Sequence, residues 1–268
     1  CRTSARSARA PWTISTICLD FMRLDSAYHA PVLASDVTEL LRTSTRVLDC
    51  TLGGGGHSLA LLDGGVETVV GVDRDPDALA AATERLSEYA ARGRFSAVQS
   101  NYAAIDEVSA LSGMQFDGIL LDLGISSHQV DDAARGFTFR PHARLDMRMG
   151  PDVPTDAAAL LNSEDEETLT VVFRILGDEP RGARLAREIV RRRANKPFET
   201  SDDLVGAIRA VLGPRSGSAD FARLFQAVRI AVNEELSGLE RALPALRDRL
   251  TPGGTIVVIA YHSGEDRI

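Results

Sequence analysis

Glycines, a histidine and two carboxylates lie at or just after the ends of short apolar segments of the sequence. The stretch VLDCTLGGGGHS places Gly53–Gly56 and His57 directly after an apolar run. Asp73 closes the next such run, and Asp122 lies near the end of a later one, FDGILLDL. Glycine lacks a Cβ and lets backbone approach a ligand, while carboxylates accept hydrogen bonds or protons. The spacing therefore predicts one ligand site assembled from the ends of several segments.

The order of the glycines separates two kinds of cofactor loop. The dinucleotide fingerprint G-x-G-x-x-G fails, because its third glycine would fall on Ser58 or Leu59. This disfavours a nicotinamide dehydrogenase. Asp49-x-x-x-Gly53-x-Gly55 instead has the shape of the first motif of methyltransferases that use S-adenosylmethionine (SAM). A simple turn is the alternative for the glycine run taken alone.

Side chains further along the chain fit the remaining parts of SAM. Asp73 is placed to accept hydrogen bonds from ribose hydroxyls, and Asn101 and Tyr102 are placed to touch adenine. Asp122 would lie beside the transferred methyl group. Taken singly, Asp73 could cap a helix and His57 could start one. Together, in this order, they predict a SAM pocket.

The elements that must position these residues alternate between strand and helix. Asp75 followed by Pro76 predicts a helix start after the second strand. This alternation predicts a doubly wound, Rossmann-like parallel α/β sheet, whose ligands bind beyond the carboxyl ends of the strands. Apolar, β-branched runs predict the strands at Arg46–Leu52, Glu67–Asp73, Phe95–Val98, Phe116–Leu123 and Thr251–Tyr261.

The alternation breaks after the fourth strand, where helix and loop patterns replace strands. We therefore expect residues 22–130 and 223–268 to form the sheet domain and residues 131–222 to form an inserted helical domain. Phe225–Leu250 is expected to be one helix before the fifth strand.

Residues 1–21 differ from the rest of the chain, because arginines lie among serines and alanines with no acid before Asp20. We expect a non-native or disordered leader, with Met22 as the true start. An organelle-targeting peptide is the alternative.

Composition limits the classes of partner. Net charge is -8, so the whole molecule is no polycation and RNA binding must use a local patch. The three cysteines form no CxxC pair or Cys/His cluster, which predicts no metal and a reduced, cytoplasmic setting. No apolar run approaches the roughly 20 residues that cross a bilayer, so no membrane partner is expected.

A basic patch lies between residues 174 and 196, where eight basic residues accompany three acidic ones. Arg184, Arg187 and Arg191 fall on one helical face. With Arg192, they are predicted to bind RNA phosphates. A solvated amphipathic helix surface is the alternative.

The stretch LLDLGISSHQVDDAARGFTF, followed closely by LDMRM, is much more specific. It resembles the RsmH (MraW) family, the SAM-dependent methyltransferases of small-subunit ribosomal RNA. The likeness recurs in HAPVL, FQAVRIAVNEEL and YHSGEDRI, and so spans about Tyr28 to the end of the chain.

The resemblance implies a class I SAM-dependent methyltransferase that methylates N4 of one cytidine in the decoding region of 16S rRNA, in the small ribosomal subunit. Tyr102 falls where the family usually has phenylalanine, and stacking on adenine would survive that change. Oligomeric state stays open between monomer and homodimer. The implied cofactor contacts are Gly55, Gly56, His57, Asp73, Asp122 and Gln129, to which the glycine pattern adds Gly53.

Several positions depart from the family pattern. Gly54 replaces a side chain, often arginine, His128 stands where proline is usual, and Gly264 replaces a leucine. The chain ends at Ile268, where the family continues with strands that finish its sheet, so we expect those strands to be missing. A non-catalytic RNA-binding relative, or a methyltransferase of another nucleic-acid amine, stays open.

The implied reaction needs a proton acceptor, because the exocyclic amine of cytosine is a poor nucleophile and must lose a proton. Asp122 is the leading candidate, with a purely structural role as the alternative. His262 is a weaker candidate for the same chemistry or for base contact, and it too has a structural alternative. Phe137 and Phe139 are candidates to stack on the target base, with burial between the domains as the alternative.

Overall fold

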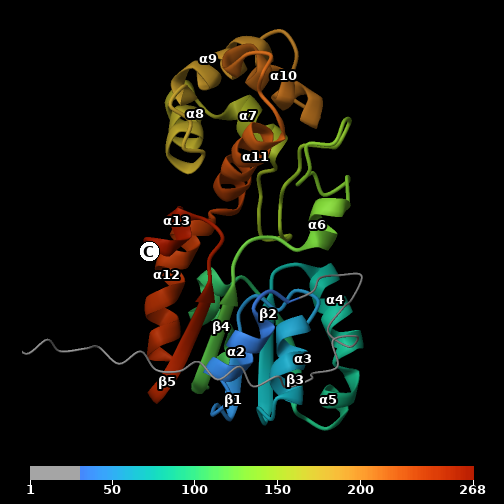
Figure 1. Cartoon of the computed structure of the whole chain (residues 1–268), viewed down its shortest axis with the longest axis vertical. Helices are drawn as coiled ribbons and strands as arrows, with labels where there is room; N and C mark the ends of the chain where they lie inside the picture. Colours follow the sequence, from blue (N-terminus) through green and yellow to red (C-terminus); the bar gives the residue numbers. More distant parts are fainter. Residues whose placement is uncertain (1–30) are drawn as a thin grey trace, which may run out of the picture.

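The computed structural model describes residues 31–268, and its centre is a five-stranded sheet in which all strands run parallel (Figure 1). The strand order is β3-β2-β1-β4-β5, which confirms the predicted doubly wound, Rossmann-like class. The predictions for residues 1–21 and Met22 lie outside the described residues. The strands are β1 (Arg46–Asp49), β2 (Thr68–Asp73), β3 (Phe95–Gln99), β4 (Phe116–Asp122) and β5 (Leu250–Ile259).

The central strands bury both faces, because successive side chains of an apolar run point to opposite sides of the sheet. Val47 pairs with Val69, and both lie in the core on one face. Leu48 pairs with Val70, and both lie in the core on the other face. Continuous apolar runs therefore form strands that need helices above and below.

Helices supply that cover on both faces. The side chain of Asp75 accepts a hydrogen bond from a backbone N–H of α4, and Pro76 opens this helix, as the sequence predicts. The helices packed on one face are α2 (Ala34–Leu40), α3 (Gly56–Asp63), α4 (Pro76–Arg85) and α5 (Ser87–Ala91). Those on the other face are η1 (Tyr102–Glu107), η2 (Ser109–Leu111) and α12 (Glu235–Asp248).

A second group of helices, at the top of Figure 1, has an apolar core of its own. Along residues 31–268, no helix combines the length and apolarity needed to cross a membrane. The helices of this group are α7 (Ala157–Ser163), α8 (Glu166–Val171), η3 (Val172–Leu176), α9 (Gly182–Arg193), α10 (Ser201–Leu212) and α11 (Ser218–Asn233). Two short helices, α6 (Ser127–Asp131) and α13 (Ser263–Asp266), lie outside it.

Helix α11 crosses the boundary predicted at residue 222. Its buried Phe225, Val228 and Val232 belong to the core of the helical group and not to the sheet cores. We therefore propose that the helical unit continues to Asn233.

Two predicted elements differ from the structure. The single helix predicted at Phe225–Leu250 is wrong, because α11 and α12 meet at Glu234, whose φ of +51° no α-helix passes through. The fifth strand ends two residues before Tyr261, which therefore lies beyond the sheet.

Helix α10 begins with a capping box that offers a first test of the helical unit. Asp203 accepts hydrogen bonds from the Glu199 and Thr200 backbone N–H groups at 3.1 and 3.0 Å, and from Lys196 Nζ at 2.9 Å. Burial raises the pKa of Asp203, but these donors outweigh burial and bring the pKa to about 2.

We expect Asp203→Ala to lower the free energy of unfolding by about 1–2 kcal/mol at neutral pH, the usual effect of losing a helix cap. Because the folded-state pKa is lowered, the stabilisation is present above about pH 4 and is lost as pH falls toward 2. Denaturant unfolding at pH 7 and pH 3 measures both effects. An unchanged midpoint at pH 7 would contradict this account of the cap.

Candidate functional site

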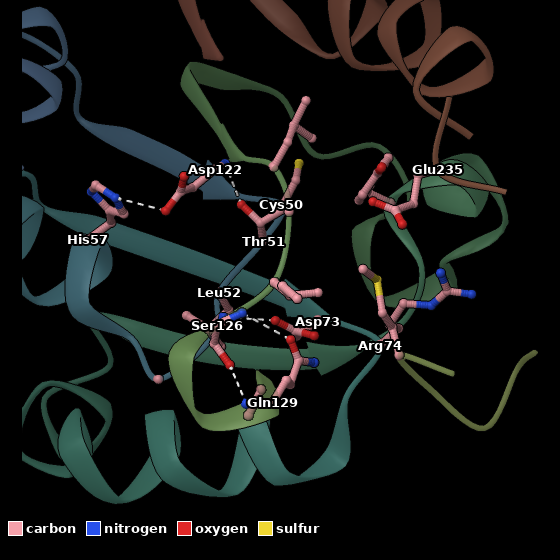
Figure 2. Close-up of a pocket in the computed structure, with 18 of the residues that line it drawn as sticks. Cys50, Thr51, Leu52, His57, Asp73, Arg74, Asp122, Ser126, Gln129 and Glu235 are labelled. Carbon is pink, nitrogen blue, oxygen red and sulfur yellow. Dashed lines mark hydrogen bonds and ion pairs between the residues drawn. The ribbon is translucent and has the colours of Figure 1, made fainter. Parts of the chain in front are cut away.

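A cavity lies beyond the carboxyl ends of the strands, where the sequence predicts a ligand site (Figure 2). It holds about 1120 Å³ of space, including its open mouth, and pockets of this size accept cofactor-sized ligands. Loops after all five strands contribute to its walls. The predicted site residues that line it are Gly53, Gly56, His57, Asp73, Tyr102, Asp122 and Gln129.

The glycine loop follows β1, and its glycines have two roles: some line the cavity and one allows close helix packing. Gly53 and Gly55 have φ of +51° and +75°, a region that side chains disfavour. Gly53, Gly54 and Gly56 line the cavity, but Gly55 does not. A Cβ on Gly55 would lie 3.0 Å from Leu86 Cδ1, so this glycine allows α3 to pack against the end of α4. The geometry therefore places Gly54, which had no assigned role, at the cavity, and does not support a cavity-facing Gly55.

Asp49, at the end of β1, holds the turn into this loop. Its side chain is 1% exposed and accepts hydrogen bonds from Ser58 Oγ at 2.7 Å and from the Thr51 N–H at 3.2 Å. Burial raises the pKa of Asp49, while His57 and the Ser58 hydroxyl oppose that rise. Asp49 thus fixes the conformation of the loop through these hydrogen bonds and does not itself line the cavity.

Asp73, at the end of β2, faces the cavity with both carboxylate oxygens anchored. Oδ2 accepts the Gly53 N–H at 2.7 Å and Oδ1 accepts the Asp75 N–H at 2.9 Å. Burial raises the pKa of Asp73 to about 6, although the two backbone donors oppose this. Each oxygen keeps a lone pair, so the carboxylate can still accept from the hydroxyls of a ligand.

The carboxylate of Asp122, at the end of β4, is contacted from two sides. The Tyr261 hydroxyl donates to Oδ1 at 2.9 Å. His57 Nε2 lies 3.3 Å from Oδ2, as Figure 2 shows. The Asp122 backbone N–H donates to Thr51 Oγ1 at 2.6 Å. His57 is 6% exposed, and neither ring nitrogen forms an aligned hydrogen bond within the described part of the chain. The 3.3 Å approach is thus a proximity contact, and the imidazole retains capacity for a ligand.

Charged side chains that the sequence did not single out occupy the other side of the cavity, where Figure 2 shows Glu235 and Arg74. Glu235 is 8% exposed and accepts from Arg229 Nε at 2.8 Å and Nη2 at 2.9 Å. Burial raises the pKa of Glu235, and Arg229 opposes that rise. Among residues 31–268, no group of three or more His, Cys, Asp or Glu side chains is arranged to hold a metal ion.

Contacts made by residues of the helical unit also shape this side of the cavity. Arg74 Nε donates to Asp152 Oδ1 at 3.1 Å. The Asn233 side chain accepts the Met149 N–H at 2.8 Å and donates to the Met147 carbonyl at 2.7 Å. Because Met149 lines the cavity, the junction of α11 and α12 helps to set the cavity wall.

Gln129 lines the cavity, but most of its amide is already engaged. Its Nε2 donates to Asp75 Oδ2 at 2.7 Å, and its Oε1 accepts the Ser126 N–H at 3.0 Å. One amide hydrogen is left for a ligand. Gln129 therefore ties the loop after β4 to the start of α4 as well as facing the cavity.

Three residues predicted to serve the acceptor do not line the cavity. His262 caps α13, its Nδ1 accepting a backbone N–H at 3.2 Å, and its Nε2 lies 3.1 Å from Glu265. Phe137 is buried in the core of the helical unit, and Phe139 packs edge to face on two rings of α11. The alternative for the two phenylalanines was burial between the domains, but both pack within the helical unit, where Phe137 is buried and Phe139 is partly buried. The geometry does not support a chemical role for His262.

The predicted RNA-binding arginines lie on α9 and differ in exposure and in how closely they pair with carboxylates. Arg184 and Arg187 are exposed, although Arg187 lies 3.2 Å from a carboxylate of α8. Arg191 and Arg192 both donate to Glu188, at 2.8 and 2.7 Å, and these hydrogen bonds lower the pKa of Glu188 to about 2. Part of the positive charge expected from the sequence is therefore neutralised within the helix.

Comparison with known proteins extends over almost the whole chain. The sequence profile of the MraW methylase family matches residues 26–268. The ribosomal RNA small subunit methyltransferase H of Gemmatimonas aurantiaca is 67% identical over 241 residues, covering 90% of this chain and 76% of its own length. The protein of the same name from Heliobacterium modesticaldum is 46% identical over 250 residues, covering 90% and 79%.

Proposed function

Since this chain belongs to the MraW methylase family, we propose that it transfers a methyl group from SAM to N4 of a cytidine in the decoding region of 16S rRNA. Its parallel sheet has the class I methyltransferase fold. The names of its relatives support ribosomal RNA of the small subunit as the substrate, and we propose that the protein acts in the cytoplasm. One observation carries the proposal: a single cavity joins the glycine loop, Asp73 and Asp122.

The lining of this cavity fits SAM. Gly53 and Gly54 bring backbone without a Cβ to its wall, and Asp73 offers free lone pairs to the ribose hydroxyls. Tyr102 provides a ring for adenine. His57 is buried with unpaired ring nitrogens, a condition that a polar ligand would relieve.

When bound, SAM supplies an electrophilic methyl group carried on a sulfonium. The residues of the chain must then align the weakly nucleophilic amine and accept its proton. We assign proton acceptance to the Asp122 carboxylate, which accepts a hydrogen bond from the Tyr261 hydroxyl and has His57 Nε2 3.3 Å away on its other side. His262 has no part in this step, because it does not line the cavity.

Cofactor affinity is expected to fall as the pH drops through 6. The pKa of Asp73 is about 6, so its carboxylate is charged above this pH and protonated below it. A charged carboxylate accepts hydroxyl hydrogen bonds more strongly. Calorimetry with S-adenosylhomocysteine between pH 5 and 8 measures the change, and Asp73→Asn should flatten it. Equal affinity at pH 5 and pH 8 in the unmodified protein would contradict this role of Asp73.

The exposed face of α9 is proposed to contact RNA phosphates through Arg184 and Arg187. The logarithm of RNA affinity falls linearly with the logarithm of salt concentration. Replacing both arginines by alanine should make this slope shallower by the contribution of about one to two phosphate contacts. Arg191→Ala should change it less, because Glu188 already holds that side chain. Binding titrations at several salt concentrations compare the slopes. An unchanged slope in the double variant would remove this face from the interface.

Two measurements test the cofactor and the substrate class separately. Calorimetry should detect SAM and not NAD, since the dinucleotide fingerprint fails. Labelled SAM should transfer its methyl group to undermethylated small ribosomal subunits and not to duplex DNA. Labelled DNA would favour a methyltransferase of another nucleic-acid amine, and SAM binding without any transfer would favour a non-catalytic relative.

A further inference from the structure

Tyr261 combines exposure with a position beside the proposed proton acceptor. It lies just after β5, is 52% exposed and lines the cavity. Its hydroxyl donates to Asp122 Oδ1 at 2.9 Å. Gly124, with φ of +107°, brings bare backbone toward the ring, and a Cβ there would lie 3.5 Å from Tyr261 Cδ2. An accessible aromatic ring thus stands where the acceptor must approach Asp122.

The backbone around Tyr261 is held by a buried carboxylate. Glu265 is 7% exposed, and its Oε2 accepts the Tyr261 N–H at 2.8 Å. His262 Nδ1 accepts the Gly264 N–H at 3.2 Å, so both residues of the turn are anchored to α13. A residue placed by such internal contacts can present a ring in one orientation, which a binding surface requires.

A nucleobase is the ligand that suits this ring. RNA-modifying proteins bind unstacked bases on aromatic side chains, and a base that undergoes chemistry must leave its stack. Phe137 and Phe139 are packed in the helical unit, so they are not available. The aromatic rings among the described cavity-lining residues are those of His57, Tyr102 and Tyr261. The His57 ring is 6% exposed, and Tyr102 lies beside Asn101 in the region assigned to adenine.

We propose that Tyr261 stacks on the target cytosine and that its hydroxyl orients Asp122 toward the exocyclic amine. This rests on the proposed function, because it assumes that a cytidine is the acceptor. The ring and the hydroxyl have separate tasks, so different substitutions separate them. Tyr261→Phe keeps the ring, while Tyr261→Ala and Tyr261→Leu remove it.

The stacking role is tested by binding, without methyl transfer. Two rRNA fragments are compared by fluorescence anisotropy, one with the target cytidine and one with an abasic site at that position. The unmodified protein and Tyr261→Phe should prefer the cytidine fragment by roughly 5- to 150-fold, the range of base–aromatic stacking. Tyr261→Ala and Tyr261→Leu should lose most of this preference. If they keep the full preference, Tyr261 does not stack on the base.

The orienting role is tested by comparing kcat with KM. Tyr261→Phe removes the hydroxyl that donates to Asp122 Oδ1, so kcat should fall. KM for the subunits should stay close to that of the unmodified protein, because the ring remains. Tyr89→Phe is the matched control, since its hydroxyl also donates to a carboxylate, Asp63, away from the cavity. An unchanged kcat in Tyr261→Phe would refute the orienting role.

Outcomes for the two proposals are distinguishable. Unchanged affinity for S-adenosylhomocysteine shows that each variant is folded. If the unmodified protein does not methylate a cytidine, the proposed function fails and the role of Tyr261 falls with it. If a cytidine is methylated but Tyr261→Ala keeps its preference for the base, only the role of Tyr261 is overturned.

Discussion

Replacing Asp122 with asparagine is expected to slow methyl transfer by roughly 100- to 10,000-fold, the usual contribution of a positioned general base. The amide keeps the size of the carboxylate and can still accept from Tyr261, but it cannot take the amine proton. SAM affinity, measured by calorimetry, should fall far less than kcat. The loss would then lie in the chemical step.

Asp117 offers a matched control for this experiment. It lies on the same strand as Asp122, and its carboxylate accepts the Thr45 and Arg46 N–H groups at 2.8 Å, away from the cavity lining. Asp117→Asn should leave the transfer rate unchanged. If Asp122→Asn retained the rate of the unmodified protein, Asp122 would be a structural residue at a strand end, the alternative that the sequence left open.

The largest stability loss is expected from breaking the buried pair of Arg229 and Glu235. Arg229→Met would leave the Glu235 carboxylate without its two donors, at 2.8 and 2.9 Å. Removing one partner of a buried ion pair costs about 3–5 kcal/mol of folding free energy. Chemical denaturation should show that loss at pH 8.

The pH dependence and a double variant test this explanation. Burial already raises the pKa of Glu235, and removing Arg229 takes away an opposing influence. A carboxyl group whose pKa is raised in the folded state stabilises the fold more as the pH falls and it becomes protonated. The difference in unfolding free energy between Arg229→Met and the unmodified protein should therefore become smaller as the pH is lowered from 8 to 5. Adding Glu235→Leu should recover most of the loss, since an apolar pair replaces the ions. A double variant less stable than Arg229→Met would contradict the account.

The parts of the fold that depend on local pattern were predictable from the sequence. The apolar runs predict the five strands, and Asp75 followed by Pro76 predicts the start of α4, which is capped as expected. In a parallel sheet the strand ends share one edge, so Asp73 and Asp122 were predicted to meet at one site. Both line the same cavity.

The direction of single residues in loops was not predictable, because it depends on packing between distant segments. Gly54 and Gly55 are neighbours of the same residue type, so the sequence does not show which of them faces the cavity. In the structure Gly54 lines the cavity, and Gly55 packs close to Leu86 at the end of α4. Asp122 is the last residue of β4, whereas His262 lies beyond the end of β5 and turns to cap α13. The break at Glu234 carries no glycine or proline, and the preceding Asn233 is the one residue of a type that often ends helices.

Identification of the methylated atom is the decisive test of the proposed reaction. The protein is incubated with labelled SAM and undermethylated small ribosomal subunits, and the RNA is digested to nucleosides. We expect the label to appear in N4-methylcytidine from the decoding region of 16S rRNA. Label on a ring carbon, on a ribose hydroxyl or on another base would contradict the proposed reaction, as would the absence of label from the RNA.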